Sequence, residues 1–253
     1  MAGYKTFTFV GDSGPWIKKL ILNLPQLLRA NDVSESSFNV YVERKDPKTG
    51  ELVFAKDHHW EKTAKPSHGY IPIRHAYVSD ESGNAAPVGK HVVLEFEETR
   101  LTKRIDGDIT HGHLRKNEFR VTQLRAFPAE RAGDPDLVGL AWTQDEGDIC
   151  PQLKGWNWEL SGIFAGIKMN YAAYCPNLQE VNECRMHMPF SKGPLPKLEK
   201  IPLVLWLHGA GEGGGEPYRT ITGNKVVALG EKDIQTKLGG AAYVLAPSSP
   251  TFW

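Results

Sequence analysis

Cysteine is scarce in this 253-residue sequence, and this scarcity argues against a fold held together by a framework of disulfides. The three cysteines, Cys150, Cys175 and Cys184, are an odd number and follow no metal-ligand spacing. Buried thiols are the expected state of such residues. One disulfide stays open as an alternative if the protein is exported.

Long apolar runs and an excess of charge of one sign are also missing. No run approaches the roughly 18 apolar residues of a membrane span, and the start, MAGYKTFTFVGDSG, lacks the basic and apolar regions of a secretory signal. Lys+Arg and Asp+Glu both number 30, so the net charge is zero and no global field attracts nucleic acid or an anionic membrane. We therefore expect no nucleic-acid partner, no membrane partner and, by default, a cytoplasmic location.

What the first two thirds of the sequence do contain is a series of short segments in which apolar and polar residues alternate. Turns rich in Gly, Asn, Asp and Pro separate them, which is typical of an antiparallel β-sandwich. We expect this sandwich to span residues 1–165. A helix also fits the pattern of residues 17–28, but a strand is preferred there. The expected strands cover residues 4–10, 16–24, 38–44, 70–78 and 89–97, with weaker ones at 119–124 and 137–142.

The last third changes character. A strand is expected at residues 167–174, and fully apolar strands at 203–207 and 241–246 flank a helix expected at 224–238. Strand, helix and strand with fully apolar strands is the pattern of a parallel sheet covered on both faces. Residues 166–253 are therefore expected to open an α/β domain.

A glycine-rich corner, His208-Gly209-Ala210-Gly211-Glu212, follows the first of these apolar strands. Small residues there let backbone N–H groups point into the cleft at the carboxyl edge of a sheet, where they can hold the oxyanion of a tetrahedral intermediate. A simple turn explains the same glycines. A phosphate loop is disfavoured, because no Gly-Lys-Ser/Thr follows.

Two segments here resemble one family. LVLWLHGAGEGG (203–214) is similar to the oxyanion-loop strand of α/β-hydrolases of the esterase, polyhydroxybutyrate-depolymerase-like and prolyl-oligopeptidase-like group, and APSSPTFW (246–253) is similar to the segment that closes their next strand. Upstream, residues 14–22 and 76–90 resemble the N-terminal immunoglobulin-like domain of some of these esterases. The resemblance implies an all-β immunoglobulin-like sandwich followed by the first part of an α/β-hydrolase parallel sheet.

The resemblance also implies a function and a departure from it. The family needs a Gly-x-Ser-x-Gly nucleophile elbow, an acid and a histidine after the oxyanion loop, and no Gly-x-Ser-x-Gly occurs in these 253 residues. The sequence therefore resembles the N-terminal portion of a serine carboxylesterase-type hydrolase, without the catalytic Ser, acid and His, and is expected to show no esterase activity by itself. The implied oxyanion hole is Gly209, Ala210 and Gly211, with His208 and Glu212 shaping the loop. The implied substrate of the full-length protein is a small ester, no cofactor is required, and self-association through the immunoglobulin-like part is left open.

Three other features suggest chemistry less strongly. Gly11-Asp12-Ser13-Gly14-Pro15 is similar to the serine motif of chymotrypsin-like proteases, but it comes too early for a preceding His and Asp, so a turn is expected. A metal site is not expected, because no spacing places a third ligand beside any histidine pair. The histidines concerned are His58, His59, His111, His113 and His187.

Four tryptophans give some support to a second hypothesis, in which the protein binds carbohydrate instead of hydrolysing esters. Trp60, Trp142, Trp156 and Trp158 could stack on sugars, although packing in a core or an interface is the commoner use of such rings. The second hypothesis is therefore a non-catalytic immunoglobulin-like interaction or carbohydrate-binding module that carries a vestigial hydrolase segment.

Overall fold

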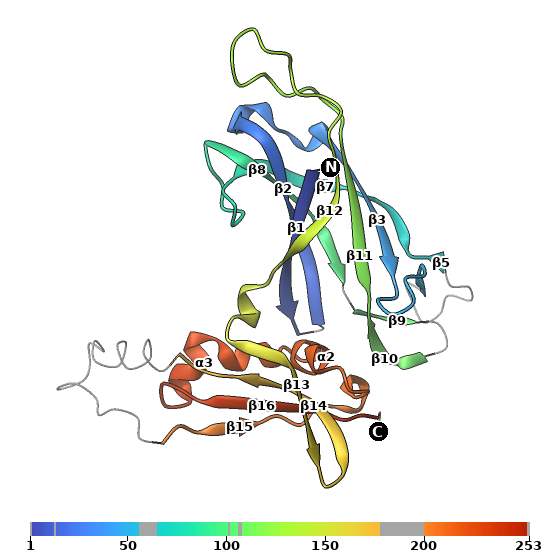
Figure 1. Cartoon of the computed structure of the whole chain (residues 1–253), viewed down its shortest axis with the longest axis vertical. Coiled ribbons are helices and arrows are strands. Elements are labelled where there is room, and N and C mark those ends of the chain that lie inside the picture. The colour runs from blue at the N-terminus through green and yellow to red at the C-terminus, as the bar shows by residue number, and fades with distance from the viewer. Residues whose placement is uncertain are drawn as a thin grey trace, which may run out of the picture. The chain divides into compact units, whose positions relative to one another are not determined.

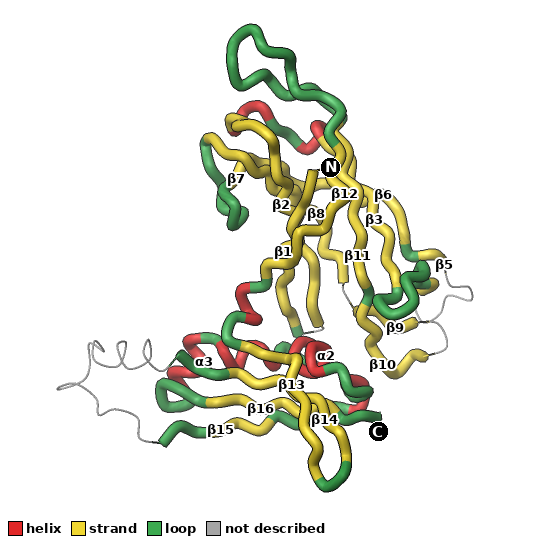
Figure 2. Tube along the Cα trace, in the orientation of Figure 1, coloured by secondary structure: helices red, strands yellow, loops and turns green. Residues whose placement is uncertain are grey.

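A computed structural model of the chain places more than half of the residues that it describes in strands, with a few short helices (Figure 2). The chain divides into two compact units, the first made of residues 1–9 and 15–150 and the second of residues 10–14 and 151–253. None of the helices in the described part of the chain is long and apolar enough to cross a membrane. The structure describes residues 2–12, 14–55, 65–100, 102–105, 108–177 and 200–251.

The first unit is built on one eight-stranded sheet with the strand order β6-β3-β11-β12-β1-β2-β8-β7 (Figure 1). Two short hairpins, β4–β5 and β9–β10, accompany it. The bounds are β1 Ala2–Gly11, β2 Gly14–Arg29, β3 Phe38–Lys45, β4 Phe54–Ala55, β5 Lys65–Pro66, β6 His68–Ile71, β7 Ile73–Ser79, β8 Val88–Arg100, β9 Thr102–Ile105, β10 Asp108–Leu114, β11 Lys116–Gln123 and β12 Ala141–Ile149, with short 3-10 turns at Ala30–Asp32 (η1) and Glu35–Ser37 (η2).

Alternation explains why these segments form strands with one buried face. In β3 the residues Phe38, Val40 and Val42 are buried while their neighbours along the strand are not. Successive side chains of a strand point to opposite faces, so each strand adds every second residue to one core. Trp142 is fully buried in that core, and its Nε1–H donates to the carbonyl oxygen of Asn23 at 2.7 Å.

Most of the expected strands are present, but the one expected at 137–142 is not, because β12 begins only at Ala141. Residues 14–29 form one strand of 16 residues, which rules out the helix considered there. The segment 70–78 is interrupted at Pro72, as expected for a residue that cannot donate to a sheet ladder. The expectation of a purely antiparallel sheet was wrong, because β1 and β12 pair in parallel.

The second unit is a four-stranded sheet with the order β13-β14-β16-β15. Strands β15 and β16 are parallel, whereas β14 is antiparallel to both β13 and β16. The helices connect β15 to β16 and lie along one side of this sheet (Figure 1). The bounds are η3 Pro151–Leu153, β13 Trp156–Phe164, β14 Ile167–Tyr174, β15 Leu203–Leu205, η4 Ala210–Glu212, α2 Pro217–Gly223, η5 Val226–Gly230, α3 Lys232–Lys237 and β16 Tyr243–Ser248.

Several expectations for this part need correction. The sheet is mixed rather than wholly parallel, and the helix expected at 224–238 is two short helices preceded by α2. Strand β13 was not expected, and it pairs with β14, so residues 156–164 belong to the second sheet although the sandwich was expected to reach residue 165. The face bearing Leu203 and Leu205 is exposed, so covering on both faces is not observed among the described residues.

Candidate functional site

The carboxyl end of β15 positions the glycine-rich corner. Because β15 and β16 are parallel, their carboxyl ends meet at one edge of the sheet, and His208 reaches Ser249 there. The backbone N–H of Ser249 donates to Nε2 of the buried His208 at 3.0 Å, and Nδ1 of His208 lies 2.7 Å from the carbonyl oxygen of Gly209. An Nε2 atom that accepts a hydrogen bond carries no proton, so this pattern assigns the neutral imidazole with its proton on Nδ1. His208 thus ties the corner to β16.

The glycines that follow are held against the same segment. The N–H groups of Gly214 and Gly215 both donate to the carbonyl oxygen of Ser249, at 2.9 and 2.7 Å. Both glycines have left-handed backbone angles, with φ of 95° and 77°, which explains why glycine is present. Nδ2 of Asn170 on β14 donates to the carbonyl oxygen of Gly215 at 2.9 Å, and the buried Arg219 donates from Nη2 to that of Gly213. These contacts account for this stretch as a structural turn.

Glu212 fastens the corner to the end of α2. Its Oε2 accepts from the N–H of Gly209 at 3.1 Å, as the third residue of a capping box does, and its Oε1 accepts from Nδ2 of Asn224. A Cβ atom at Gly223 would lie 2.9 Å from Oε1 of Glu212, so glycine leaves the space that the carboxylate fills.

The remaining donors of the corner are Ala210 and Gly211. The Gly209 N–H is taken by Glu212 and the Glu212 N–H by the carbonyl oxygen of Gly209 at 3.1 Å. Within the described residues, no acceptor is recorded for the N–H groups of Ala210 and Gly211. Ala210 is exposed and Gly211 half-buried, so an incoming acceptor could reach them.

Two buried polar atoms lie at the carboxyl ends of β15 and β16, one just after β15 and one at the end of β16. In the described part of the chain, the hydroxyl of the fully buried Ser248 and Nε1 of Trp206 have no hydrogen-bond partner. Buried polar groups are usually satisfied. In this respect the carboxyl edge of β15 and β16 differs from an ordinary packed interior.

The five residues predicted for the site, 208–212, are thus fastened at both ends, by Ser249 at His208 and by Asn224 at Glu212. Sequence reasoning missed Asn170, Arg219 and Asn224, which support the corner from other elements and carry no local signal. Ser249 lay inside a segment already singled out, but its partnership with His208 depends on the parallel pairing of two strands.

The histidines and the Gly-Asp-Ser-Gly motif named in the sequence analysis form no site among the described residues. No cluster of three His, Cys, Asp or Glu that could hold a metal occurs among the described residues. His58, His59, His187, Trp60 and Cys184 lie outside the described residues, as do the side chains of His111 and His113. Residues 11 and 14 end β1 and begin β2, so the Gly-Asp-Ser-Gly motif links two strands, although Ser13 itself is outside the described residues.

The tryptophans and the remaining cysteines have clear places. Trp142 and Trp156 are buried, and the ring of Trp158 meets Tyr218 edge-on with centroids 5.8 Å apart, so these rings serve packing. Cys175 is exposed, contrary to the expectation of buried thiols, and Cys150 is half-buried.

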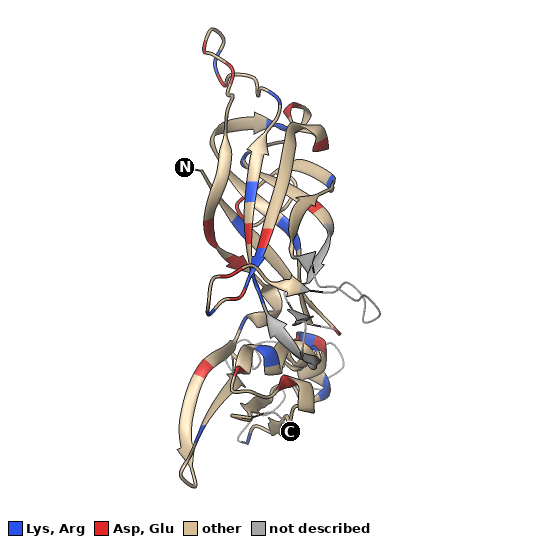
Figure 3. Ribbon diagram, turned by 90° about the vertical axis from the view of Figure 1, so that its right-hand side faces the viewer, with Lys and Arg blue, Asp and Glu red and all other residues tan. Residues whose placement is uncertain are grey.

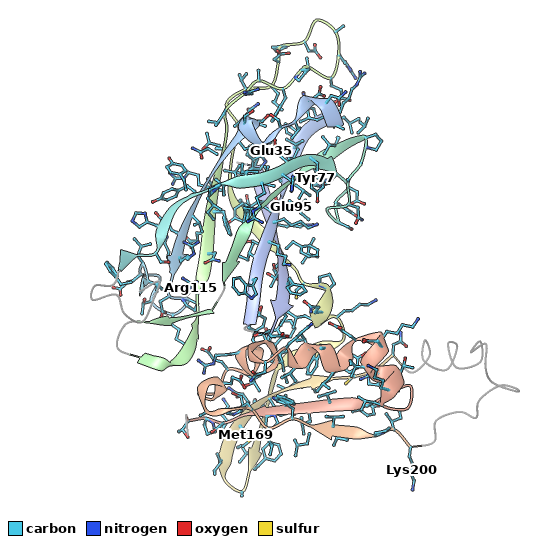
Figure 4. All side chains as sticks on the ribbon, turned by 180° about the vertical axis from the view of Figure 1, so that it is seen from behind. Glu35, Tyr77, Glu95, Arg115, Met169 and Lys200 are labelled. Carbon is cyan, nitrogen blue, oxygen red and sulfur yellow. The ribbon has the colours of Figure 1, made fainter. Side chains whose placement is uncertain are left out.

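Titratable groups outside the corner form local pairs in the first unit. The Tyr77 hydroxyl donates to Oε1 of Glu95 at 2.9 Å (Figure 4), and burial together with this carboxylate raises the pKa of Tyr77 well above its usual value. Arg115, also labelled there, is buried and donates from Nη1 to the hydroxyl of Ser67 at 3.2 Å. Each of these two groups bonds to a neighbouring side chain within the first unit, which is typical of pairs that stabilise a fold.

Comparisons with known proteins identify a family for the first part of the chain and a solved structure with a similar fold. Residues 3–130 match the family model of the esterase Ig-like N-terminal domain. The whole chain is similar to a crystal structure described as that of a thermostable esterase, with a TM-score of 0.66 and 19% sequence identity. That match covers 98% of this chain and 57% of the esterase, so the chain spans little more than half of its length. No curated protein matches the chain.

Proposed function

Because the chain belongs to the family of the esterase Ig-like N-terminal domain, we propose that it is the N-terminal portion of a serine carboxylesterase-type hydrolase that acts on small ester substrates. The first unit would be the immunoglobulin-like sandwich. The second would be the beginning of an α/β-hydrolase sheet, with β15, η4 and β16 as its oxyanion-loop segment.

The observation that carries this proposal is the pair of N–H groups at Ala210 and Gly211. They follow a strand at the carboxyl edge of a parallel pair and have no acceptor within the described residues. In an acyl transfer reaction such donors hold the negative oxygen of the tetrahedral intermediate. Gly209 belongs to the same loop, but its N–H would become a donor only if Glu212 released it. His208 and Glu212 would position the loop.

The chemistry itself would follow the Ser-His-Asp/Glu pattern. A serine would attack the ester carbonyl, a histidine would take the hydroxyl proton and later give it to the leaving alcohol, and a carboxylate would orient the histidine. No Gly-x-Ser-x-Gly occurs in the 253 residues, so the proposal requires that this nucleophile lie outside them. No cofactor is needed for these steps.

A proline substitution tests the role of the loop in the gene product read to its own stop codon. Ala210→Pro removes one N–H at the first position of η4, where proline is tolerated, and the extended backbone of Gly209 (φ −77°, ψ 169°) is compatible with a following proline. We expect kcat for p-nitrophenyl acetate to fall by about 100-fold or more with a small change in KM. Ala210→Gly, which keeps the N–H, is the control. Equal activity of the two variants would contradict the assignment.

A second experiment separates the esterase from a non-catalytic module. The 253-residue chain should show no hydrolysis of p-nitrophenyl acetate that a serine-directed phosphonate abolishes, because it lacks the nucleophile elbow. The reading frame beyond codon 253 should encode Gly-x-Ser-x-Gly, then an acid, then a histidine. Phosphonate-sensitive activity of the short chain, or a stop codon directly after residue 253, would count against the proposal.

A further inference from the structure

Three aromatic rings gather on the solvent side of the first unit's sheet, at its β6 edge. Tyr41 of β3 and Tyr70 of β6 are direct partners in the antiparallel register, and their rings meet edge-on with centroids 5.2 Å apart. The third ring is His68 of β6, whose centroid lies 6.0 Å from that of Tyr41 and whose Nδ1 lies 2.7 Å from the Tyr41 hydroxyl. We call these three residues the aromatic platform.

The platform faces away from the core. Val40 and Val42 of β3 are buried, so Tyr41, between them, points to the opposite side. Tyr70 is 70% exposed, the most exposed tyrosine whose exposure the structure describes. A cross-strand aromatic pair contributes about 0.2–1 kcal/mol to a sheet, and such a pair does not require one ring to be left in water. Core packing therefore does not explain why Tyr70 is aromatic.

Charged side chains surround the platform but neutralise one another. Lys45 lies 3.1 Å from the carboxylate of Glu43 and 2.6 Å from that of Glu118, and Lys116 lies 3.1 Å from Glu118. These are two cations and two anions. Figure 3 shows positive and negative residues interspersed on the first unit rather than segregated. Arg120, which is opposite Tyr41 in the β11–β3 register, adds an exposed planar donor.

This combination favours an uncharged ligand with apolar faces and a hydroxylated rim. A nucleic acid needs a basic surface, and the net charge of this chain is zero. An apolar peptide would remove water from the surrounding charged side chains without offering them hydrogen bonds in return. A pyranose ring presents C–H groups on its faces, which pack on an aromatic ring, and hydroxyl groups around its edge, which bond to carboxylates, guanidinium and phenol groups.

We propose that the aromatic platform binds a neutral pyranose polysaccharide, with one sugar stacked on Tyr70 and hydroxyl groups bonded to Arg120, Glu43 and the Tyr41 hydroxyl. Within the described residues, β6 is an edge strand of the sheet. The proposal is independent of ester hydrolysis: it concerns a surface of the first unit and holds whether or not the protein is an esterase. The platform is also a different site from the tryptophans named in the sequence analysis, because Trp142, Trp156 and Trp158 pack within the protein.

Affinity electrophoresis of the 253-residue chain tests this proposal. Native gels contain hydroxyethylcellulose or arabinoxylan as neutral polysaccharides and dextran sulfate as an anionic one. We expect retardation by at least one neutral polysaccharide. Retardation by dextran sulfate alone, or by none of the three, would overturn the proposal.

Variants locate the binding. Tyr70→Ala should weaken binding by about tenfold, as loss of one stacked ring predicts, whereas Tyr70→Phe should keep most of it. Arg120→Ala changes an exposed donor without touching the core and should also weaken binding. Tyr243→Ala, at an exposed tyrosine of the second unit, is the matched control and should bind like wild type. Equal retardation of Tyr70→Ala and wild type with unchanged melting temperatures, or equal losses in Tyr70→Ala and Tyr243→Ala, would contradict the site.

Discussion

Apolar strand residues are buried in the core of the first unit but exposed on the edge strand of the second unit's sheet. In the eight-stranded sheet, Leu20, Val40 and Leu94 are fully buried in one continuous core. In the four-stranded sheet, Leu203 and Leu205 of the edge strand β15 are more than half exposed. All of these residues lie in strands, so strand formation alone does not decide burial. The difference teaches that an apolar strand is buried only where another layer of the same unit meets its face.

The largest expected effect comes from a substitution that creates a cavity in the core of the first unit. Leu94→Ala removes a fully buried side chain and should lower the free energy of unfolding of the first unit by about 2–5 kcal/mol. Leu205→Ala, at a residue 56% exposed, should change stability by no more than about 0.5 kcal/mol. Urea denaturation followed by circular dichroism measures both. Similar losses in the two variants would erase the contrast between the sheets.

The corner of the second unit should respond next. Glu212→Ala removes the acceptor of the Gly209 N–H and of Asn224, and should cost about 1–2 kcal/mol locally. Hydrogen exchange of the Gly209 amide should then accelerate, with little change in strand β8. Glu159→Ala, at an exposed carboxylate on β13, is the control. Unchanged protection of Gly209 in Glu212→Ala would show that the carboxylate does not hold the loop.

The exposed apolar face should be visible in binding rather than in stability. Exposed apolar strands and open edges recruit partners. Leu205→Lys should therefore lower the fluorescence of bound anilinonaphthalene sulfonate and reduce self-association in analytical ultracentrifugation. Leu124→Lys, at a residue 58% exposed in the first unit, is the matched control. Equal effects of the two substitutions would mean that the face on β15 is not special.

The smallest effect concerns a turn of the first unit. Hydrogen bonds from the Asn84 side chain and from the backbone N–H groups of Asn84 and Ser82 lower the pKa of Asp80. A lowered pKa in the folded state means that this contribution to stability is present above the unfolded pKa of about 3.9 and is lost as the pH falls through the folded value. Asp80→Asn should remove this dependence. Urea midpoints of both proteins between about pH 6 and about pH 3 measure it, and parallel curves would contradict it.

The sequence by itself determined where most strands lie, because alternation is a local property. Residues 167–174 form β14 as predicted, and the strands of the first unit follow their apolar-polar pattern. It also marked the corner 208–212, since a run of small residues after an apolar strand is visible without a structure. Strand β13 was not predicted because only part of its alternating pattern is apolar, with Trp156 as its one buried residue.

Only the tertiary structure decided what these elements face and which donors remain available. The parallel pairing of β15 and β16 brings Ser249 to His208, and the end of a separate helix brings Asn224 to Glu212. The exposure of Tyr70 likewise depends on β6 being the edge strand. The physical reason is that hydrogen bonds and burial at these positions join residues far apart in the chain, whereas alternation and turn chemistry act between neighbours.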